Sequence, residues 1–300
     1  MNGSTSYRTI TDHLPQKLRD MLLSLNEGLL HGLMEVRLRS GGPVYFVYPE
    51  RILFLGRNSE LRSDSRELYI VSAAEIKAIL DRLCHFSVHS CPSQLSQGWF
   101  VIGNGVRVGL AGMYSSTSQP VLTDLSSLNF RISREVRGCA DGLFPQIYDK
   151  NVIICGGVGS GKTSILRELC RLNGSLRKTA LIDERNEISC FCDGAPRYDV
   201  GLMTDILVNC TRSFGISSAV RTMSPELIIC DEIASSEDTE AIVSGIACGV
   251  RFIVTAHGEN MQEACKRPEL RYLTESGLFH RIVFLKGASR PGETGEIIRL

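Results

Sequence analysis

The chain has 300 residues, and its 33 basic side chains balance 33 acidic ones, so the formal net charge is zero. This balance gives no general electrostatic argument for a partner that is nucleic acid or an acidic membrane surface. The length predicts two domains, and the sequence has no run of about 18 apolar residues that would predict a membrane-spanning helix.

The eleven cysteines are scattered along the chain, and only Cys190 and Cys192 lie close together in sequence. Because no C-x-x-C pair occurs, we do not expect a structural zinc site. The number of cysteines is odd, and residues 1–20 form a polar lead-in without the pattern of a signal peptide. Together these features predict a protein of the reducing cytosol.

The first part of the chain mixes helix and strand patterns. Helical spacing predicts one helix, and alternating or short apolar runs predict five strands, in order at residues 14–30, 35–39, 44–48, 51–55, 99–102 and 106–111. Ser72 and Glu75 have the spacing of a capping box that begins a second helix. Residues 103–105, Gly-Asn-Gly, separate the last two strands as in a β-hairpin. We therefore predict a compact α+β domain over residues 1–134.

The connection to the rest of the chain is rich in serine, threonine and arginine. Residues 115–127 contain several Ser and Thr residues and one Pro, so they predict a linker or a long loop. Arg131, Arg134 and Arg137 follow this stretch. Each is a candidate to contact a phosphate group, although any single arginine is more often a surface residue.

From residue 151 onward, strand and helix patterns alternate. Strands are expected at 152–155, 179–183, 227–231, 252–256 and 281–285, and helices near 162–173, 213–221, 237–248, 259–266 and 270–277. This alternation predicts an α/β domain over residues 135–300, with a parallel sheet and helices on both of its faces. Such sheets bind ligands at the carboxyl ends of their strands, where the polar motifs of this chain fall.

Residues 156–163 read GGVGSGKT and fit the pattern G-x-x-x-x-G-K-[ST] of a phosphate-binding P-loop. Glycines let successive backbone N–H groups point at phosphate oxygens, Lys162 reaches the β- and γ-phosphates, and the Thr163 hydroxyl ligates Mg²⁺. The dipole of the following helix favours the same negative charge. We expect nucleotide contacts from Gly156, Gly157, Val158, Gly159, Ser160, Gly161, Lys162, Thr163 and Ser164. A plain glycine-rich turn would not explain the Lys-Thr pair.

Two carboxylates, Asp231 and Glu232, follow an apolar strand pattern, as in a Walker B element. Asp231 is expected to hold Mg²⁺, which prefers oxygen ligands, and Glu232 to polarise the attacking water. The alternative is a strand end with two solvated acids. His257 ends another apolar strand pattern. If that strand lies between the strand before the P-loop and the strand before Asp231, His257 faces the γ-phosphate. The alternative is a structural role, which is more common for a lone histidine.

Residues 181–187, LIDERNE, carry three acids and one arginine after a further strand pattern. They form either a solvated loop or a loop that places Glu184 or Glu187 near the metal ion or its water. Arg221 lies ten residues before Asp231 and is a candidate to approach a phosphate in its own or a neighbouring subunit.

The motifs GGVGSGKT, LIDERNEI, RTMSPELIICDE and IVTAH resemble, in this order, the Walker A, Asp box, Walker B and His box of type II and type IV secretion ATPases. The stretches EVRLRSGGPV, SQGWFVIGNGVRVGLAGMY and NFRISREVRGCADGLFP are more closely similar to the stage III sporulation protein AA family. The resemblance covers most of the chain, from Glu35 to near Leu285.

This resemblance implies a RecA-like P-loop ATPase core preceded by a smaller α+β N-terminal domain. It implies Mg²⁺-dependent ATP hydrolysis by a homohexameric ring, with ATP between the two domains. It also implies a cytoplasmic protein at the inner face of a membrane, on the mother-cell side of the forespore membrane. Its partners would be integral-membrane sporulation or secretion channel proteins.

The resemblance also assigns roles to residues of this chain. Phosphate and Mg²⁺ binding fall to Gly156, Gly161, Lys162 and Thr163, Walker B to Asp231 and Glu232, the acidic box to Glu184 and the His box to His257. Arg131 and Arg134 join the nucleotide-binding set from the first domain. Two features depart from the secretion ATPases: the residue before the Walker B glutamate is Asp231 where Gly is common, and no tetracysteine zinc module is present.

Two other functions stay open. A DNA-translocating or DNA-remodelling ATPase would use the same core, although zero net charge and the lack of basic–aromatic clusters argue against nucleic acid. The other is a nucleotide-gated scaffold without hydrolysis, against which the intact Lys162, Asp231 and Glu232 argue. The absence of an N-K-x-D motif favours ATP over GTP.

Overall fold

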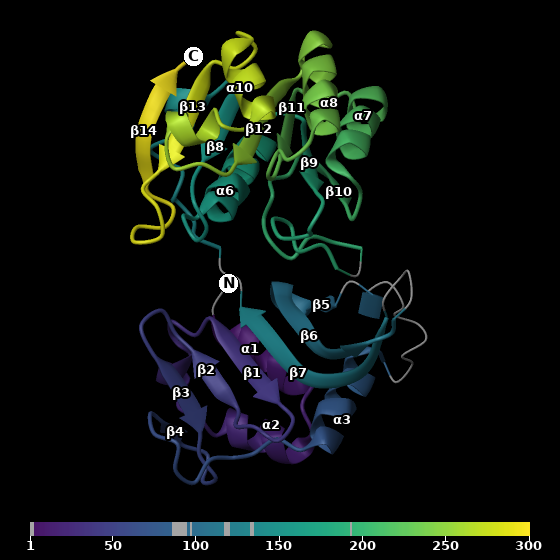
Figure 1. Cartoon of the computed structure of the whole chain (residues 1–300), viewed down its shortest axis with the longest axis vertical. Helices are drawn as coiled ribbons and strands as arrows, with labels where there is room; N and C mark the ends of the chain where they lie inside the picture. Colours follow the sequence, from purple (N-terminus) through teal and green to yellow (C-terminus); the bar gives the residue numbers. More distant parts are fainter. Residues whose placement is uncertain (1–2, 86–94, 97, 117–120, 133–134, 193) are drawn as a thin grey trace. The chain divides into compact units, whose positions relative to one another are not determined.

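The chain forms two compact units, shown in the computed structural model of Figure 1. The structure describes residues 3–85, 95–96, 98–116, 121–132, 135–192 and 194–300. The first unit comprises Met1–Arg134 and Cys192–Arg197, and the second comprises Glu135–Phe191 and Tyr198–Leu300. A short segment from within the second part of the sequence thus packs with the first unit. Over the described ranges, no helix has the length and apolar character needed to cross a membrane.

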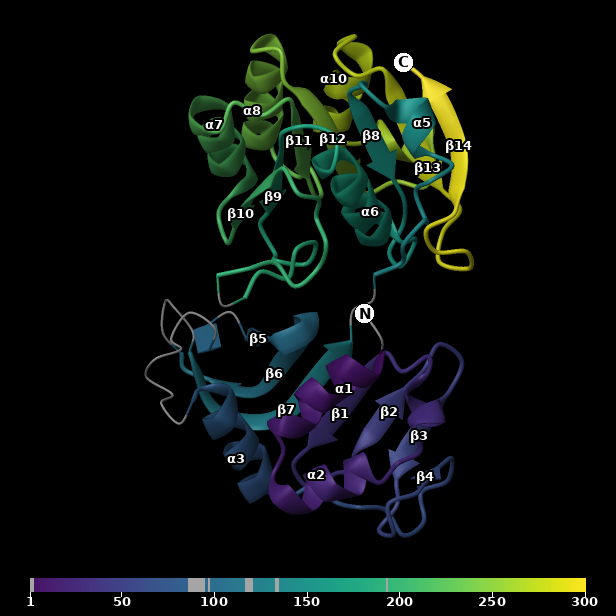
Figure 2. The same cartoon turned by 180° about the vertical axis from the view of Figure 1, so that it is seen from behind.

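The first unit is built on an antiparallel sheet, which has seven strands within the described residues. They run in the order β4-β3-β2-β1-β7-β6-β5, with bounds β1 Glu35–Arg39, β2 Tyr45–Val47, β3 Ile52–Leu55, β4 Leu61–Arg62, β5 Trp99–Ile102, β6 Val106–Tyr114 and β7 Leu122–Ile132. The helical elements are α1 Gly3–Asp12, α2 Gln16–Leu23, α3 Ala73–Leu83 and the 3-10 turns Glu27–Leu30 and Gly103–Gly105. Alternate strand residues such as Val36, Val108 and Phe130 are buried in the core of this unit. Figure 2 shows α1, α2 and α3 on one face of the sheet.

Several predictions for this unit are confirmed. Ser72 and Glu75 form a complete capping box at the start of α3. Strands β5 and β6 pair as an antiparallel hairpin around Gly103–Gly105. The capping box satisfies two backbone N–H groups that the first turn of a helix otherwise leaves without partners, so this helix start can be recognised from sequence.

Three predictions for this unit are wrong in part. The lead-in contains α1, because Tyr7 and Ile10 are buried in the core. The helix expected at 14–30 ends at Leu23, since Asn26 caps a separate 3-10 turn by accepting a hydrogen bond from the Gly28 N–H at 2.8 Å. Part of the expected loop at 115–127, residues 122–127, is strand, because β7 begins at Leu122 and pairs with β6. Residues 117–120 of that stretch lie outside the described residues.

The second unit is a sheet in the order β10-β9-β11-β12-β8-β13-β14, and β14 is its antiparallel strand. The strand bounds are β8 Val152–Cys155, β9 Thr179–Asp183, β10 Thr204–Val208, β11 Leu227–Cys230, β12 Arg251–Ala256, β13 Arg281–Leu285 and β14 Thr294–Arg299. The helices are α5 Phe144–Ile147, α6 Lys162–Gly174, α7 Arg212–Thr222, α8 Ser236–Ala247, α9 Met261–Ala264 and α10 Pro268–Glu275. The expected strands 152–155, 179–183 and 281–285 have the same bounds as β8, β9 and β13.

Helices cover both faces of the second sheet, as the alternating pattern predicts. Alternate residues of the central strands belong to different cores: Ile153 and Cys230 pack on the side of α7, α8 and α10, whereas Ile154 and Ile229 pack on the side of α5 and α6. Figure 1 shows the first group of helices and Figure 2 the second. Burial on both faces explains why β8 and β11 are continuous apolar runs. Because β9, β11, β12 and β8 are parallel neighbours, their carboxyl ends lie side by side along one edge of the sheet.

Candidate nucleotide-binding and catalytic site

The P-loop connects the end of β8 to the start of α6. Gly161 has φ 89°, in the left-handed region, and a Cβ built on it would lie 2.3 Å from the Gly292 nitrogen. Any side chain at this position is therefore excluded by both backbone conformation and space. The Gly292 N–H donates a hydrogen bond to the Ser160 carbonyl at 2.8 Å, so the β13–β14 connection supports the loop from outside.

Lys162 curls back over the P-loop. Its Nζ donates hydrogen bonds to the carbonyl oxygens of Gly156 at 2.7 Å and Gly157 at 2.9 Å. The Ser160 hydroxyl donates to the same Gly157 carbonyl at 2.8 Å. The ammonium group thus lies against the concave backbone that the P-loop pattern assigns to phosphate binding.

The remaining P-loop residues occupy the tip of the loop and the first turn of α6. Val158 is 87% exposed, so its side chain makes no appreciable packing and only its backbone is suited to contact a ligand. Thr163 and Ser164 are half-buried at the amino end of α6, where backbone N–H groups have no partner within the helix. The Thr163 hydroxyl is an oxygen donor of the kind that Mg²⁺ prefers.

Strand β12 lies between β11 and β8, which meets the condition set for His257. His257 follows Ala256 at the carboxyl end of β12 and is half-buried. Two residues before His257, on β12, lies a residue that binds the Asp231–Glu232 pair: Thr255, whose side chain is fully buried. Its hydroxyl donates to the Asp231 carboxylate and accepts from the Glu232 N–H at 2.7 Å. Sequence reasoning missed Thr255, although a hydroxyl near the end of an otherwise apolar strand is a recognisable signal.

Asp231 is a buried carboxyl group in an acidic neighbourhood. Burial raises its pKa, and the negative charges of Glu187 and Glu232 raise it further, while the hydrogen bond from Thr255 acts in the opposite direction. A cation beside Asp231 would remove this electrostatic penalty. The donor set of Asp231 with the Thr163 hydroxyl consists of hard oxygen atoms and therefore fits Mg²⁺.

Glu232 has an unusual backbone and a charged partner. Its φ is 39°, which is uncommon for a residue with a side chain. The carboxylate forms an ion pair with Arg185 at 3.3 Å, and the two side chains are 33% and 59% exposed. A residue held in such a conformation requires support from its surroundings, here from the hydrogen bond between its N–H and Thr255.

The acidic stretch after β9 divides into residues with different contacts. Asp183 is buried and accepts hydrogen bonds from the N–H groups of Glu187 at 2.9 Å, Ile188 at 3.1 Å and Ser189 at 2.8 Å, so it shapes the loop. Glu184 is bound to Arg212 at 2.7 Å. Of the two glutamates left open by the sequence, Glu187 is the one whose charge acts on Asp231.

The candidate arginines are dispersed. Arg131 lies on β7 of the first unit and pairs with Glu35 at 3.6 Å. Arg137 lies in the second unit and pairs with Asp199 at 3.3 Å, while Arg134 lies outside the described residues. Arg221 is in the last turn of α7, which leads to the amino end of β11. Arg221 is therefore at the edge of the sheet opposite the P-loop of its own chain.

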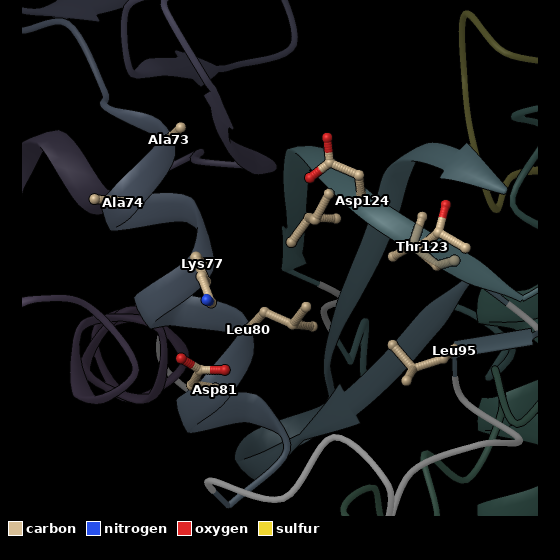
Figure 3. A pocket seen from close by; sticks show the side chains of 10 residues that line it. Ala73, Ala74, Lys77, Leu80, Asp81, Leu95, Thr123 and Asp124 are labelled. Atoms are coloured by element: carbon tan, nitrogen blue, oxygen red, sulfur yellow. The ribbon is translucent and has the colours of Figure 1, made fainter.

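A separate cavity of about 490 Å³ lies in the first unit, between α3 and β7. Figure 3 shows Leu80 from the helix and Leu95 from the other wall pointing toward this space, with Lys77 and Asp81 along the helix. None of the residues that line it belongs to the motifs of the candidate site. The cavity therefore adds nothing to the chemistry at the P-loop.

Comparison with known sequences gives one full-length family match. The sequence model of the family described as "Sporulation stage III, protein AA" matches residues 5–299. Stage III sporulation protein AA of Bacillus subtilis (strain 168) is 33% identical over 299 residues, which cover 96% of this chain and 94% of that protein. The uncharacterized protein ycf45 of Cyanidium caldarium is 29% identical over 153 residues, 49% of this chain and 45% of that protein.

Solved structures share the fold. The Legionella pneumophila ATPase DotB aligns with a TM-score of 0.59 and 16% identity, over 90% of this chain and 76% of DotB. The pilus retraction motor PilT, solved with bound ADP, aligns with a TM-score of 0.58 and 15% identity, over 86% of this chain and 75% of PilT. The expected fold class, a smaller α+β part followed by an α/β part with a parallel sheet that carries the P-loop, is confirmed, and the structure adds the antiparallel strand β14 to that sheet.

Proposed function

The chain belongs to the stage III sporulation protein AA family, and from this premise we propose that it is a Mg²⁺-dependent ATPase that acts as an oligomer. The observation that carries the proposal is the strand order β11-β12-β8, which brings the P-loop and the Asp231–Glu232 pair to one edge of the sheet. The fold shared with the ATPase DotB and with PilT, which was solved with ADP, supports a nucleotide as the ligand.

In this proposal the P-loop and α6 bind the phosphates of ATP. Backbone N–H groups of the loop donate to phosphate oxygens, and Lys162 exchanges the carbonyls of Gly156 and Gly157 for the β- and γ-phosphates. Thr163 and Asp231 hold Mg²⁺ through oxygen atoms. When bound, Mg²⁺ neutralises the charge that develops on the transferred phosphoryl group.

Glu232 is the proposed catalytic residue. Its carboxylate orients the attacking water and takes up a proton, a role that requires it to turn from Arg185 toward the phosphates. The nearby Glu187 contributes a second negative charge beside Asp231, which favours the cation. His257 contacts the γ-phosphate in this proposal, which is supported by its position directly after β12, the strand between β11 and β8. Glu184 acts through Arg212, to which it is bound.

The assembly belongs to the same proposal. Residues 1–134 form an N-terminal domain and residues 135–300 the ATPase domain of a homohexamer. Arg131 and Arg134 contact the nucleotide from the first domain, and Arg221 reaches the phosphates of a neighbouring subunit, because it lies at the far edge of its own sheet. The ring energises an integral-membrane sporulation or secretion channel from the cytoplasmic, mother-cell side of the forespore membrane, without nucleic acid as a partner.

The test is phosphate release from ATP and Mg²⁺, measured over a range of protein concentrations. We expect Glu232→Gln to lower kcat by about 10²–10⁴-fold, the usual contribution of a general base, while ADP still binds. Glu226→Gln is a matched control, because Glu226 is an exposed glutamate just before the amino end of the same strand. The rate per subunit should rise with concentration if a neighbouring subunit completes the site.

Equal rates for the wild type and Glu232→Gln would refute the catalytic assignment. A rate that is independent of concentration, at concentrations where light scattering shows a monomer, would refute the contribution of a neighbouring subunit. We expect added DNA to leave turnover unchanged. Stimulation by DNA would instead favour a DNA-translocating ATPase, and ATP binding without any turnover would favour a nucleotide-gated scaffold.

A further inference from the structure

Arg212 lies at the first position of α7, outside every motif of the candidate site, and its side chain is only 11% exposed. The guanidinium group binds three residues: one directly after β11, one directly after β9 and one in the first turn of α8. Its Nε donates to the Asp231 carbonyl at 2.7 Å, Nη2 pairs with Glu184 at 2.7 Å after β9, and Nη1 pairs with Asp238 at 3.2 Å in the first turn of α8.

Asp238 extends this network along the chain. Its side chain is 6% exposed, and the oxygen that meets Arg212 also accepts a hydrogen bond from the Ala234 N–H at 3.3 Å. Ser235 caps α8 by accepting from the Asp238 N–H at 3.2 Å. The segment from Asp231 to Asp238 is therefore attached to Arg212 at both ends. A buried guanidinium with two carboxylates and a carbonyl as partners is well satisfied, so its geometry is defined.

The decisive geometry concerns one peptide group. The carbonyl of Asp231 and the N–H of Glu232 belong to the same planar unit. Arg212 holds the carbonyl at 2.7 Å, and the Thr255 hydroxyl holds the N–H at 2.7 Å. The next peptide unit is held as well, because the Ile233 N–H donates to the Thr255 carbonyl at 2.9 Å, so the units on both sides of the Glu232 Cα, where φ is 39°, are fixed. The direction in which the Glu232 side chain leaves the backbone is thereby set.

We infer that Arg212 is a positioning residue for ATP hydrolysis, which orients the Asp231–Glu232 peptide and so aims the Glu232 carboxylate at the attacking water. The inference rests on the proposed ATPase function. It also gives Glu184 a role in the acidic box, because Glu184 holds the guanidinium in place from the end of β9. Within the described part of the chain, Arg212 binds Asp231, Glu184 and Asp238 and not the P-loop, so nucleotide binding should not depend on it.

The experiment compares Arg212→Gln and Arg212→Lys with Arg177→Gln. Arg177 is a matched control, because it is 7% exposed, pairs with Asp149 at 3.6 Å and lies just before the amino end of β9, at the opposite edge of the sheet. We expect Arg212→Gln to lower kcat at least tenfold with KM for ATP and ADP affinity within about twofold of the wild type. Arg212→Lys keeps the charge and should recover part of the rate, whereas Arg177→Gln should keep kcat.

A double-mutant cycle separates positioning from general damage. If Arg212 acts through Glu232, Arg212→Gln should cause no further loss of rate in a Glu232→Gln background. Hydrogen exchange gives a readout without turnover: the amide of Glu232 should exchange at least tenfold faster in Arg212→Gln and unchanged in Arg177→Gln. Arg212→Lys serves for both measurements if Arg212→Gln does not fold.

Three results would overturn the inference: an unchanged kcat in Arg212→Gln, an equal loss of rate with and without Glu232, or unchanged exchange at Glu232. Failure of the proposed function looks different. In that case the wild type does not hydrolyse ATP, or Glu232→Gln hydrolyses it at the wild-type rate, while the exchange measurement still reports whether Arg212 holds the peptide.

Discussion

Replacing Thr255 with valine removes the buried hydroxyl by which β12 binds the Asp231–Glu232 pair at the end of β11. Valine has nearly the same shape but cannot donate to Asp231 or accept from the Glu232 N–H. The lost charge-assisted hydrogen bond contributes about 1.5–3 kcal/mol, and the amide left without its partner costs about 1–3 kcal/mol. The additional methyl group recovers about 0.8 kcal/mol. Because the Glu232 amide is only partly buried, we expect a net loss of about 2–4 kcal/mol in the free energy of unfolding.

Urea denaturation measures this loss in the unit where it occurs. Trp99 is the chain's single tryptophan and lies in the first unit, so its fluorescence reports that unit, whereas far-UV circular dichroism reports both. With a slope of about 2 kcal/mol per molar urea, the transition of the second unit should shift by about 1–2 M in Thr255→Val, and the fluorescence transition should not move.

Thr255→Ser is the matched control, because serine keeps the hydroxyl and loses only a methyl group. Its cost should be about 1 kcal/mol, the usual effect of deleting one buried methyl. If serine destabilises the second unit as much as valine, packing of the methyl group matters more than the two hydrogen bonds. That result would refute the role assigned to the hydroxyl.

Two further predictions concern the same edge of the sheet. Burial raises the pKa of Asp231 in the folded chain above its ordinary value of 3.8. The folded state therefore binds the proton more tightly than the unfolded state. The contribution of this carboxyl to stability falls as pH rises from 3.8 through the raised native pKa. Without Mg²⁺, Asp231→Asn should therefore be more stable than the wild type at neutral pH, and its urea midpoint should decline less across that range; coincident pH profiles would contradict this. Gly161→Ala combines a left-handed φ of 89° with a contact of 2.3 Å to the Gly292 nitrogen, whereas Gly249→Ala has a φ of 88° and open space. The second substitution should cost about 1–2 kcal/mol from backbone conformation alone and the first clearly more, as read from thermal unfolding midpoints; equal losses would show that the contact with Gly292 relaxes.

The elements that carry the motifs were predictable because their residues are buried on both faces. Strands β8 and β11 are fully buried, and their apolar runs stop where the backbone reaches the polar edge of the sheet. The same reasoning located β9 and β13. The candidate residues that follow these strands stand out because each has a defined position: Asp231 ends the apolar run of β11, and Lys162 ends the glycine-rich loop that follows β8.

Elements at the borders of each unit were not predictable in this way. Strands β10 and β14 are the outermost strands of the second sheet and are only partly buried, so their apolar patterns are weak. Helix α1 has a polar composition, and the burial of Tyr7 and Ile10 against the rest of the first unit stabilises it. In these places packing of distant segments outweighs local preference.

The sequence by itself determined the candidate groups: a P-loop motif with Lys162 and Thr163, and two acids at a strand end. Only the tertiary structure decided what holds those acids. Thr255 follows Glu232 by 23 residues, and Arg212 precedes Asp231 by 19. They meet at one peptide group because β12 lies next to β11 and α7 begins at the same edge of the sheet. Strand order is a property of long-range packing, which the local pattern of residues does not encode.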